Sequence, residues 1–274
     1  MQDWFYEMQT DFSRFGVRVT ALLHKEKTPY QEIKIYDTVE YGRMLVLDDV
    51  IQLTELDEFV YHEMLAHVAL HLHHNPSKVL VIGGGDGGTV REVSKHAAVK
   101  EVILAEIDER VVQVALDYLP FCSIALKNNP KLKLRIGDGL EAVRRASEEF
   151  DVIIVDSSDP VGPGEKLFTY DFYASVYKAL KPGGMVAVQG ESPWLHRPLV
   201  KRMNADIAAI FDEAAVFWGN IPTYPSGVMF FPLGCKGELP KKLLHPVLPG
   251  LKYYSAEVHK AAFVIPQYLL PDEM

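Results

Sequence analysis

Four acidic residues lie where apolar segments of this chain end, a pattern typical of a site that binds a cation or moves a proton. Asp86 lies within the glycine run 83–88, and Glu106, Asp138 and Asp156 end three apolar runs further along the chain. Carboxylates accept hydrogen bonds from hydroxyl and amino groups, and a positioned carboxylate can take up a proton during a reaction. The spacing therefore predicts one site for a ligand that carries such groups.

The glycine run GGGDGG contains the GxGxxG spacing of a nucleotide-binding turn, between an apolar segment and a helix-like one. A purely structural tight turn is the alternative, because glycine spacing alone is weak evidence. Glu106 favours a nucleoside, since an acid 20 residues after Asp86 commonly accepts both hydroxyls of a ribose. Asp138 could accept a hydrogen bond from an adenine amino group.

Asp86 argues against a dinucleotide ligand. NAD would place its pyrophosphate at the glycine turn, where the negative charge of Asp86 would repel it. A ligand with a positive group near the turn would gain a partner instead. S-adenosylmethionine and its relatives carry amines and a sulfonium, so they fit this prediction.

The segment 156–164 carries two prolines and two glycines directly after an apolar run, which predicts a loop over the same crevice. Asp156 and Asp159 would then lie at the active edge, although acids in such loops also form turns and cap helices. Further polar groups could converge there: Tyr61, Gln189, Glu191 and the segment 221–227.

Two different patterns along the chain predict two domains, residues 1–56 and 57–274. The first has short strands with little chain between them, at 17–25, 31–38, 44–47 and 50–54, which requires antiparallel pairing. A helix follows from the Thr54-x-x-Asp57 start to the Asn75-Pro76 stop. We therefore expect a small N-terminal antiparallel β-domain before the glycine run.

The second pattern alternates short apolar strands with longer amphipathic segments. Strands are expected at 79–83, 102–108, 132–138, 151–156 and 185–190, and helices at 88–96, 109–118, 139–149 and 169–180. Fully apolar strands are buried on both faces, as in a parallel sheet covered by helices. The sequence therefore predicts an α/β fold with a doubly wound parallel sheet.

Composition limits the classes of protein. The chain has 274 residues, is 48% hydrophobic and carries a net charge of −9, which fits a globular protein and opposes broad binding to nucleic acid. Cys122 and Cys235 are too few for a disulfide framework, so free thiols and a cytoplasmic location are expected. We see no signal peptide and no stretch of about 20 apolar residues, which predicts no membrane partner.

The histidines around 62–74 suggest metal binding only weakly. His62 and His67 are five residues apart, whereas the helical zinc motif needs a spacing of four to place both on one face. His71, His73 and His74 are expected to be surface residues at the end of the helix. We therefore expect no metal in the site.

At this point the sequence resembles the polyamine aminopropyltransferase family, most closely its spermidine synthase branch. The resemblance covers nearly the whole chain and rests on these segments: Trp4-Phe5, Tyr30-Gln31, 51–54, 57–64, the glycine run 83–88, 156–160, 223–227 and 259–264. It implies an N-terminal β-domain, a methyltransferase-type Rossmann-like domain and a homodimer or homotetramer. It also implies transfer of an aminopropyl group from decarboxylated S-adenosylmethionine to a diamine, with release of methylthioadenosine.

The resemblance also implies a role for each matching residue. Asp156 becomes the proton acceptor, with Tyr61 beside it. Donor binding falls to Gln31, Gln52, His62, Asp86, Glu106, Asp138, Gly139 and Pro163, and acceptor binding to Asp159, Gln189 and Tyr224. It leaves Glu191 and Trp194 without a firm role. No cofactor is expected, because decarboxylated S-adenosylmethionine is a co-substrate with an activated leaving group.

Several alternatives stay open. A methyltransferase would share the fold, but it must accept the carboxylate of S-adenosylmethionine, which Asp86 should repel. A polyamine-binding or nucleoside-sensing module would need no base at the reacting nitrogen. Putrescine is the expected acceptor, and cadaverine, agmatine or a triamine are the others.

Overall fold

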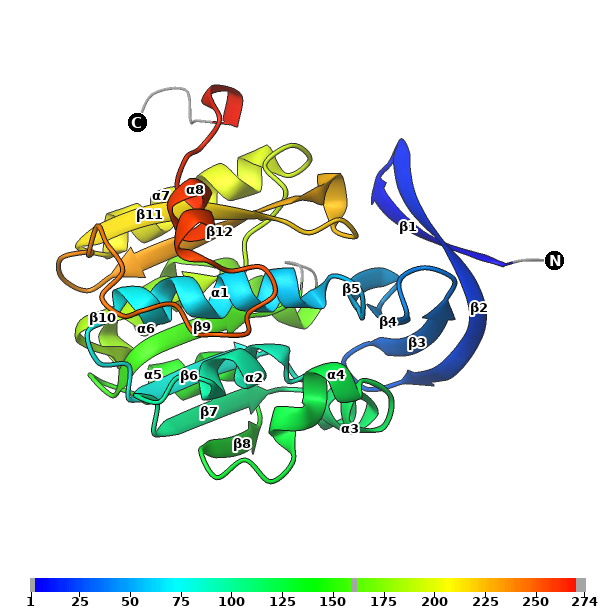
Figure 1. Ribbon diagram of the computed structural model, residues 1–274, viewed down its shortest axis with the longest axis horizontal. Coiled ribbons are helices and arrows are strands. Elements are labelled where there is room, and N and C mark those ends of the chain that lie inside the picture. The colour runs from blue at the N-terminus through cyan, green and yellow to red at the C-terminus, as the bar shows by residue number, and fades with distance from the viewer. Residues whose placement is uncertain (1–2, 159–161, 270–274) are drawn as a thin grey trace.

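The computed structural model describes residues 3–158 and 162–269, which form two sheets with helices around the larger one (Figure 1). Both predicted sheets are present, so the predicted fold class is confirmed. The boundary predicted at 56/57 falls in the short segment between the last strand of the first sheet and the helix that leads into the second. In the described part of the chain, no helix has the length and apolarity needed to cross a membrane.

The N-terminal sheet has five antiparallel strands in sequence order, at the right of Figure 1. They are β1 (Trp4–Thr10), β2 (Ser13–Lys27), β3 (Glu32–Thr38), β4 (Arg43–Leu47) and β5 (Val50–Thr54). The β4–β5 turn is two residues, Asp48 and Asp49, both with positive φ, as a tight hairpin requires. Strand β1 was not among the predicted strands.

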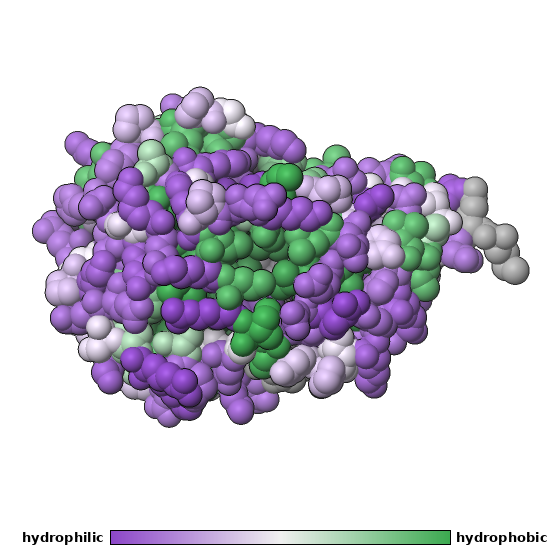
Figure 2. Space-filling view, turned by 90° about the horizontal axis from the view of Figure 1, so that it is seen from below, coloured by the Kyte–Doolittle hydropathy of each residue, from purple (hydrophilic) through white to green (hydrophobic). Residues whose placement is uncertain are grey.

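Strand β1 is an edge strand with an outward apolar face. Trp4, Tyr6 and Met8 are exposed on it, while Phe5 between them is buried against the sheet. Figure 2 shows apolar surface on this domain, at the right of the view. An edge strand with exposed apolar side chains is a candidate surface for association with another chain.

The larger sheet has seven strands in the order β11-β12-β10-β9-β6-β7-β8. Its five parallel strands are those predicted: β6 (Lys78–Gly83), β7 (Glu101–Glu106), β8 (Leu132–Ile136), β9 (Phe150–Asp156) and β10 (Leu180–Val188). The carboxyl ends of these strands point toward the N-terminal sheet (Figure 1). The crevice at this edge is where open α/β sheets bind ligands.

Two further strands make the sheet mixed. β12 (Val228–Cys235) pairs antiparallel with β10, and β11 (Glu213–Asn220) pairs antiparallel with β12. The sequence analysis predicted no strand after residue 190. The prediction of a wholly parallel sheet was therefore incomplete at this edge.

Helices cover both faces of the larger sheet. One face holds α1 (Glu58–Leu72), α2 (Gly88–Ser94) and α8 (Ala256–Ala262), and the other holds α5 (Gly139–Arg144), α6 (Tyr170–Ala179) and α7 (Arg197–Ile210). α3 (Glu109–Tyr118) and α4 (Pro120–Ser123) pack on the N-terminal sheet. The structure also has short 3-10 turns at Ile124–Leu126, Gly162–Phe168, Pro225–Gly227 and Gln267–Leu269.

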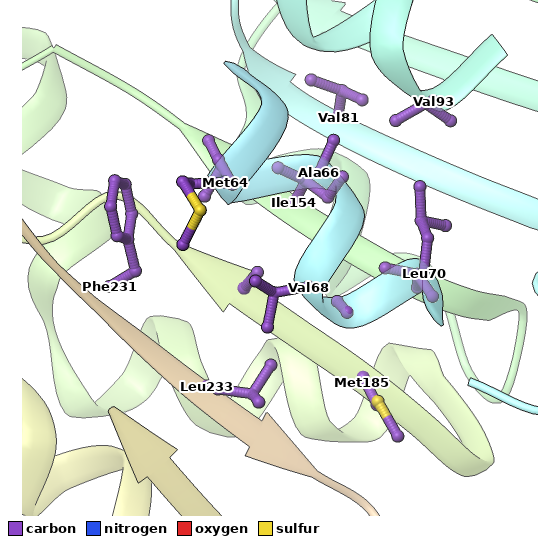
Figure 3. Close-up of a cluster of buried hydrophobic side chains, with 14 of the residues drawn as sticks. Met64, Ala66, Val68, Leu70, Val81, Val93, Ile154, Met185, Phe231 and Leu233 are labelled. Atoms are coloured by element: carbon purple, nitrogen blue, oxygen red, sulfur yellow. The ribbon is translucent and has the colours of Figure 1, made fainter. Parts of the chain in front are cut away.

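Helix α1 lies inside the molecule, with nearly every side chain buried. Figure 3 shows Met64 and Val68 of α1 against Phe231 and Leu233 of β12, with Ile154 of β9 nearby. The helix is enclosed by the larger sheet, by α2 and by residues 236–269 after β12, called the C-terminal segment below. Its polar residues must therefore find partners inside the protein. This position brings Tyr61 and His62 of α1 to the edge of the crevice.

The histidines at the end of α1 are not surface residues as predicted, apart from His74. His71 and His73 are buried, because the C-terminal segment covers this end of the helix. The Leu244 amide donates to the His71 carbonyl, and His245 Nε2 lies 2.9 Å from the His73 carbonyl oxygen. Burial lowers the pKa of His71 to about 4, so that side chain is neutral at pH 7. Both cysteines are free thiols, as expected, and are buried.

Candidate active site

A cavity of about 420 Å³ lies at the carboxyl ends of the parallel strands, between the larger sheet and the N-terminal sheet. The structure brings together around it most of the residues that the sequence analysis selected: Gln31, Gln52, Tyr61, His62, Asp86, Glu106, Asp138, Gly139, Asp156, Gln189 and Tyr224. Its apolar lining comes from both sheets and from the segments that follow their strands: Leu45, Leu47, Ile82, Ala105, Ile107, Val111 and Leu167. A cavity of this size and mixed lining is typical of a small-molecule site.

Two predicted residues are not placed in the cavity. Asp159 lies outside the residues that the structure describes, and the side chain of Pro163, in the 3-10 turn Gly162–Phe168, is also outside them. Their roles stay predictions. Glu191, which had no firm role, is buried outside the cavity lining, with His196 Nδ1 2.8 Å from its carboxylate.

The glycine turn after β6 lets the backbone pass close to two functional side chains. Gly83 and Gly84 have positive φ, and a Cβ on either would collide with Asp156. A Cβ on Gly88 would collide with the ring of His62. The glycines are therefore required by close approach at this edge of the sheet, in addition to the turn itself.

The acids at the ends of β7 and β8 line one half of the cavity. Glu106 accepts hydrogen bonds from the backbone amides of Gly85 at 3.1 Å and Asp108 at 2.8 Å. Burial nevertheless raises the pKa of Glu106 to about 7. Asp138 caps helix α5 by accepting from the Leu140 amide at 2.8 Å, so it also has the structural role that such acids commonly have.

Asp156 lies at the centre of the site, at the end of β9. Its Oδ1 accepts from the Tyr61 hydroxyl at 2.6 Å, and its Oδ2 accepts from the Thr89 hydroxyl at 2.6 Å. Tyr61 Oη also lies 2.8 Å from Gln189 Oε1. Side chains of α1 and α2 thus hold this carboxylate directly, and the residue after β10 reaches it only through Tyr61.

The surroundings tune the proton affinity of Asp156. Burial and the negative charge of Asp86 raise its pKa above the ordinary carboxylate value, while His62 and the hydrogen bonds from Thr89 and Tyr61 oppose the rise. A base works best when its pKa lies near the working pH, so this shift suits proton acceptance at neutral pH. Burial and the same carboxylate raise the pKa of Tyr61 well above 10, so the phenol stays protonated.

His62 connects Asp86 to a buried charge network. Its Nδ1 lies 2.7 Å from Glu58 and its Nε2 lies 3.2 Å from Asp86, and Arg91 pairs with Glu58 at 2.8 Å. Burial alone would lower the pKa of His62, but Asp86 and Glu58 outweigh it and raise that pKa to about 10. His62 is thus an imidazolium at pH 7. Burial alone would raise the pKa of Asp86, but the positive charge of His62 and its hydrogen bond outweigh burial and lower that pKa.

The His62 charge state bears on metal binding in the cavity. One nitrogen of His62 and oxygens of Asp86 and Asp156 lie within 4.8 Å of one another. A metal ligand must offer a lone pair, whereas both nitrogens of His62 donate to carboxylates here. These residues therefore fit a bound ammonium or sulfonium better than a metal ion.

A loop between β11 and β12 covers the side of the site nearest α1. Asp57 anchors it by accepting from the Thr223 amide and hydroxyl at 3.0 and 2.7 Å. The next residue, Tyr224, donates to the carbonyl of Gln52 at 2.6 Å and so joins the loop to the N-terminal sheet. The segment 221–227 therefore reaches the site, as the sequence analysis expected.

The sequence analysis gave no role to several polar neighbours of the cavity, among them Thr89 and Ser157. Thr89 directly follows the glycine run, and its hydroxyl holds Asp156. Ser157 lines the cavity, and its buried hydroxyl has no hydrogen-bond partner within the described part of the protein, which suits a group that meets a ligand. Ser157 directly follows Asp156 and Thr89 lies three residues after Asp86, and this proximity in the sequence was the only available signal.

Two family models match the chain, and together they cover most of it. A model described as the spermine/spermidine synthase domain matches residues 58–242. A second, described as the spermidine synthase tetramerisation domain, matches residues 3–55.

Individual proteins are similar over nearly the full length. A polyamine aminopropyltransferase from Thermoanaerobacter sp. (strain X514) is 46% identical over 271 residues, which cover 98% of each chain. Polyamine aminopropyltransferase 1 from Bacillus cereus is 42% identical over 98% of each chain.

Solved structures are similar as well. The crystal structure of spermidine synthase from Thermotoga maritima matches with a TM-score of 0.91 and 37% identity, over 97% of this chain and 92% of that one. A spermidine synthase in complex with the transition-state analogue AdoDATO matches with a TM-score of 0.92 and 37% identity, over 97% and 93% of the two chains.

Proposed function

The chain belongs to the spermine/spermidine synthase family of polyamine aminopropyltransferases, and on that premise we propose that its substrates are decarboxylated S-adenosylmethionine and putrescine. The products are spermidine and methylthioadenosine. One observation carries the proposal: a buried carboxylate, Asp156, with raised proton affinity lies between Asp86 of the glycine turn and the Tyr61–Gln189 pair. A base at that point can serve an amine that attacks a nucleoside sulfonium.

The donor lies with its adenosyl part toward the ends of β7 and β8. Glu106 accepts the ribose hydroxyls, and Asp138 and Gly139 receive the adenine. Gln31 also serves this half, and the family resemblance implies the same role for Pro163. The aminopropyl group lies near Gln52 and Asp86, whose carboxylate accepts from the terminal ammonium. Because both nitrogens of His62 are occupied, His62 acts by positioning Asp86.

The acceptor diamine lies on the other side of Asp156. Gln189 and Tyr224 line this part, and Asp159 binds the distal ammonium, as the family resemblance implies. The Ser157 hydroxyl, which has no hydrogen-bond partner among the described residues, is also available to a substrate. Asp156 at the attacking nitrogen and Asp159 at the distal ammonium would hold the two amines at a fixed separation. The acceptor part of the site should therefore select diamines by their length.

The reaction is a displacement at carbon. The neutral nitrogen of the acceptor attacks the methylene next to the sulfonium, so a C–N bond forms and a C–S bond breaks. The bonding electrons go to sulfur, which leaves as a neutral thioether. Asp156 accepts the proton from the attacking nitrogen, which is needed because an alkyl amine with a pKa near about 10 is almost fully protonated at pH 7.

No cofactor supplies a step in this scheme, because the sulfonium is already an activated leaving group.

We also propose that the enzyme is cytoplasmic, which its two free thiols support, and that it assembles as a homodimer or homotetramer through the N-terminal domain. The match of residues 3–55 to a tetramerisation domain and the exposed apolar face of β1 support that assembly.

A methylthioadenosine-release assay tests the substrate proposal. Decarboxylated S-adenosylmethionine is combined with diaminopropane, putrescine, cadaverine, agmatine or spermidine, and the nucleoside product is quantified. Putrescine should give the highest kcat/KM, with diaminopropane clearly lower because it is too short to meet both Asp156 and Asp159. A higher value for another acceptor would replace putrescine, and methyl transfer from S-adenosylmethionine without aminopropyl transfer would contradict the reaction itself.

A further inference from the structure

We propose that His67, His71 and His96 form a binding site for a divalent metal ion of the imidazole-preferring class, such as Zn²⁺, outside the active site. The three side chains are buried where α1, the segment after α2 and the C-terminal segment meet. The proposed function gives this cluster no task, because none of the three lines the cavity.

The spacing of the ligands suits one ion. His67 and His71 are four residues apart on α1, so both project from the same face of the helix. One nitrogen from each histidine lies within 4.8 Å of the others, and His67 Nδ1 is 2.9 Å from His96 Nε2. Nitrogens around a tetrahedral ion at about 2.1 Å lie roughly 3.4 Å apart, so modest ring rotations would bring the three into place.

The outer nitrogens have the partners that metal-bound histidines usually have. His67 Nε2 lies 3.0 Å from the Glu92 carboxylate, and His71 Nδ1 lies 2.8 Å from the His67 carbonyl. Each of these two outer nitrogens therefore carries the proton, which leaves a lone pair on His67 Nδ1 and on His71 Nε2. His67 Nδ1 then accepts the 2.9 Å hydrogen bond from His96 Nε2, so His96 must move its proton to Nδ1 before Nε2 can bind the ion. A carboxylate or carbonyl behind a ligating histidine fixes its tautomer and its orientation in metal sites.

One of these lone pairs has no partner. His71 Nε2 is buried and makes no hydrogen bond within the described residues. A buried polar atom without a partner carries a free-energy cost, which a metal ion coordinated there would remove. This unsatisfied nitrogen is the observation that distinguishes the cluster from three histidines that merely bond to one another.

The surroundings suit a structural role for the ion. The ring of Tyr254 stacks on His71 at a centroid distance of 5.2 Å, and the Tyr254 amide donates to Glu63 of α1 at 2.8 Å. The ion would therefore tie α1 to the segment after α2 beneath the C-terminal segment. His62, five residues before His67 on α1, faces away from this cluster and toward Asp86.

Titration of the metal-depleted full chain with Zn²⁺, after removal of any affinity tag, tests the proposal. Isothermal calorimetry should show one saturable site per chain, and zinc should raise the unfolding temperature. His71→Gln, which removes the ligand atom, should weaken binding by at least about 100-fold. Glu92→Gln, which removes only the carboxylate behind His67, should weaken it by about 10- to 100-fold.

His74→Gln is the matched control, because His74 is an exposed histidine three residues from His71. This variant should bind zinc like the wild type. Binding that is absent from the wild type, or that survives His71→Gln, would overturn the proposal. Should His71→Gln fail to fold, the visible spectrum of the Co²⁺-loaded wild type decides, since a tetrahedral nitrogen-rich site supports the proposal and an octahedral spectrum refutes it.

Discussion

Thr89 should set the pH at which the proposed base becomes active. Its hydroxyl donates a buried hydrogen bond of 2.6 Å to Asp156 Oδ2, and this bond stabilises the ionised carboxylate. Thr89→Val keeps the shape of the side chain and removes the donor. The folded-state pKa of Asp156, already raised by burial and by Asp86, should therefore rise further.

The size of the shift follows from the type of bond. A hydrogen bond to a charged group contributes about 1.5 to 3 kcal/mol, and one pKa unit corresponds to about 1.4 kcal/mol. The acidic limb of the kcat/KM profile should thus move upward by about 1 to 2 pH units. Well above that limb the base is ionised in both proteins, so the two rates should converge.

The assay is methylthioadenosine release across a range of pH with the same acceptor for both proteins, so that titration of the amine contributes equally. Thr54→Val is a matched control, because Thr54 donates an equally short buried bond, 2.6 Å, to Asp57 rather than to Asp156. That variant should leave the limb in place. A shift below about 0.3 pH units in Thr89→Val, or an equal shift in both variants, would refute Asp156 as the titrating base.

Three other changes have defined outcomes. Asp156→Asn should lower kcat by about 10² to 10⁴ while methylthioadenosine affinity stays nearly constant, and a variant that keeps more than about a tenth of the activity would show another route for the proton. Because the pKa of free Glu106 is raised to about 7, a nucleoside that hydrogen-bonds its ionised form should displace a proton below pH 7. Calorimetry in buffers of different ionisation enthalpy should therefore show methylthioadenosine affinity rising with pH up to about 7 and then levelling, and a pH-independent affinity would contradict this role. Met8→Glu on the exposed face of β1 should dissociate the oligomer in light scattering, whereas Leu134→Glu on β8, an edge strand of the larger sheet, should not; unchanged mass in both would exclude the β1 face as the interface.

The sequence predicted the frame of the site because that frame depends on local patterns. Apolar runs followed by acids place Glu106, Asp138 and Asp156 at strand ends, and parallel strands bring those ends to one edge. The glycine run likewise follows its strand and opens α2. Each of these features needs only the residue types and the handedness of the connections.

The two strands after residue 190, β11 and β12, were harder to predict. β12 joins the sheet by antiparallel pairing with β10, and β11 joins it by pairing with β12, so both depend on a strand that is distant in sequence. The role of Asp57 was similarly hidden, because the loop residue that it binds, Thr223, is 166 positions away.

Residue types and local periodicity by themselves determined the fold class, the glycine turn and the acids that line the cavity. Only the tertiary structure decided the state of each charge: His62 is an imidazolium because Glu58 and Asp86 both face it, and His71 is neutral because the C-terminal segment buries it. The physical reason is that a pKa depends on burial and on neighbouring charges, which come from segments far apart in the chain. Spacing along the sequence records which groups are present, and packing sets what each of them can do.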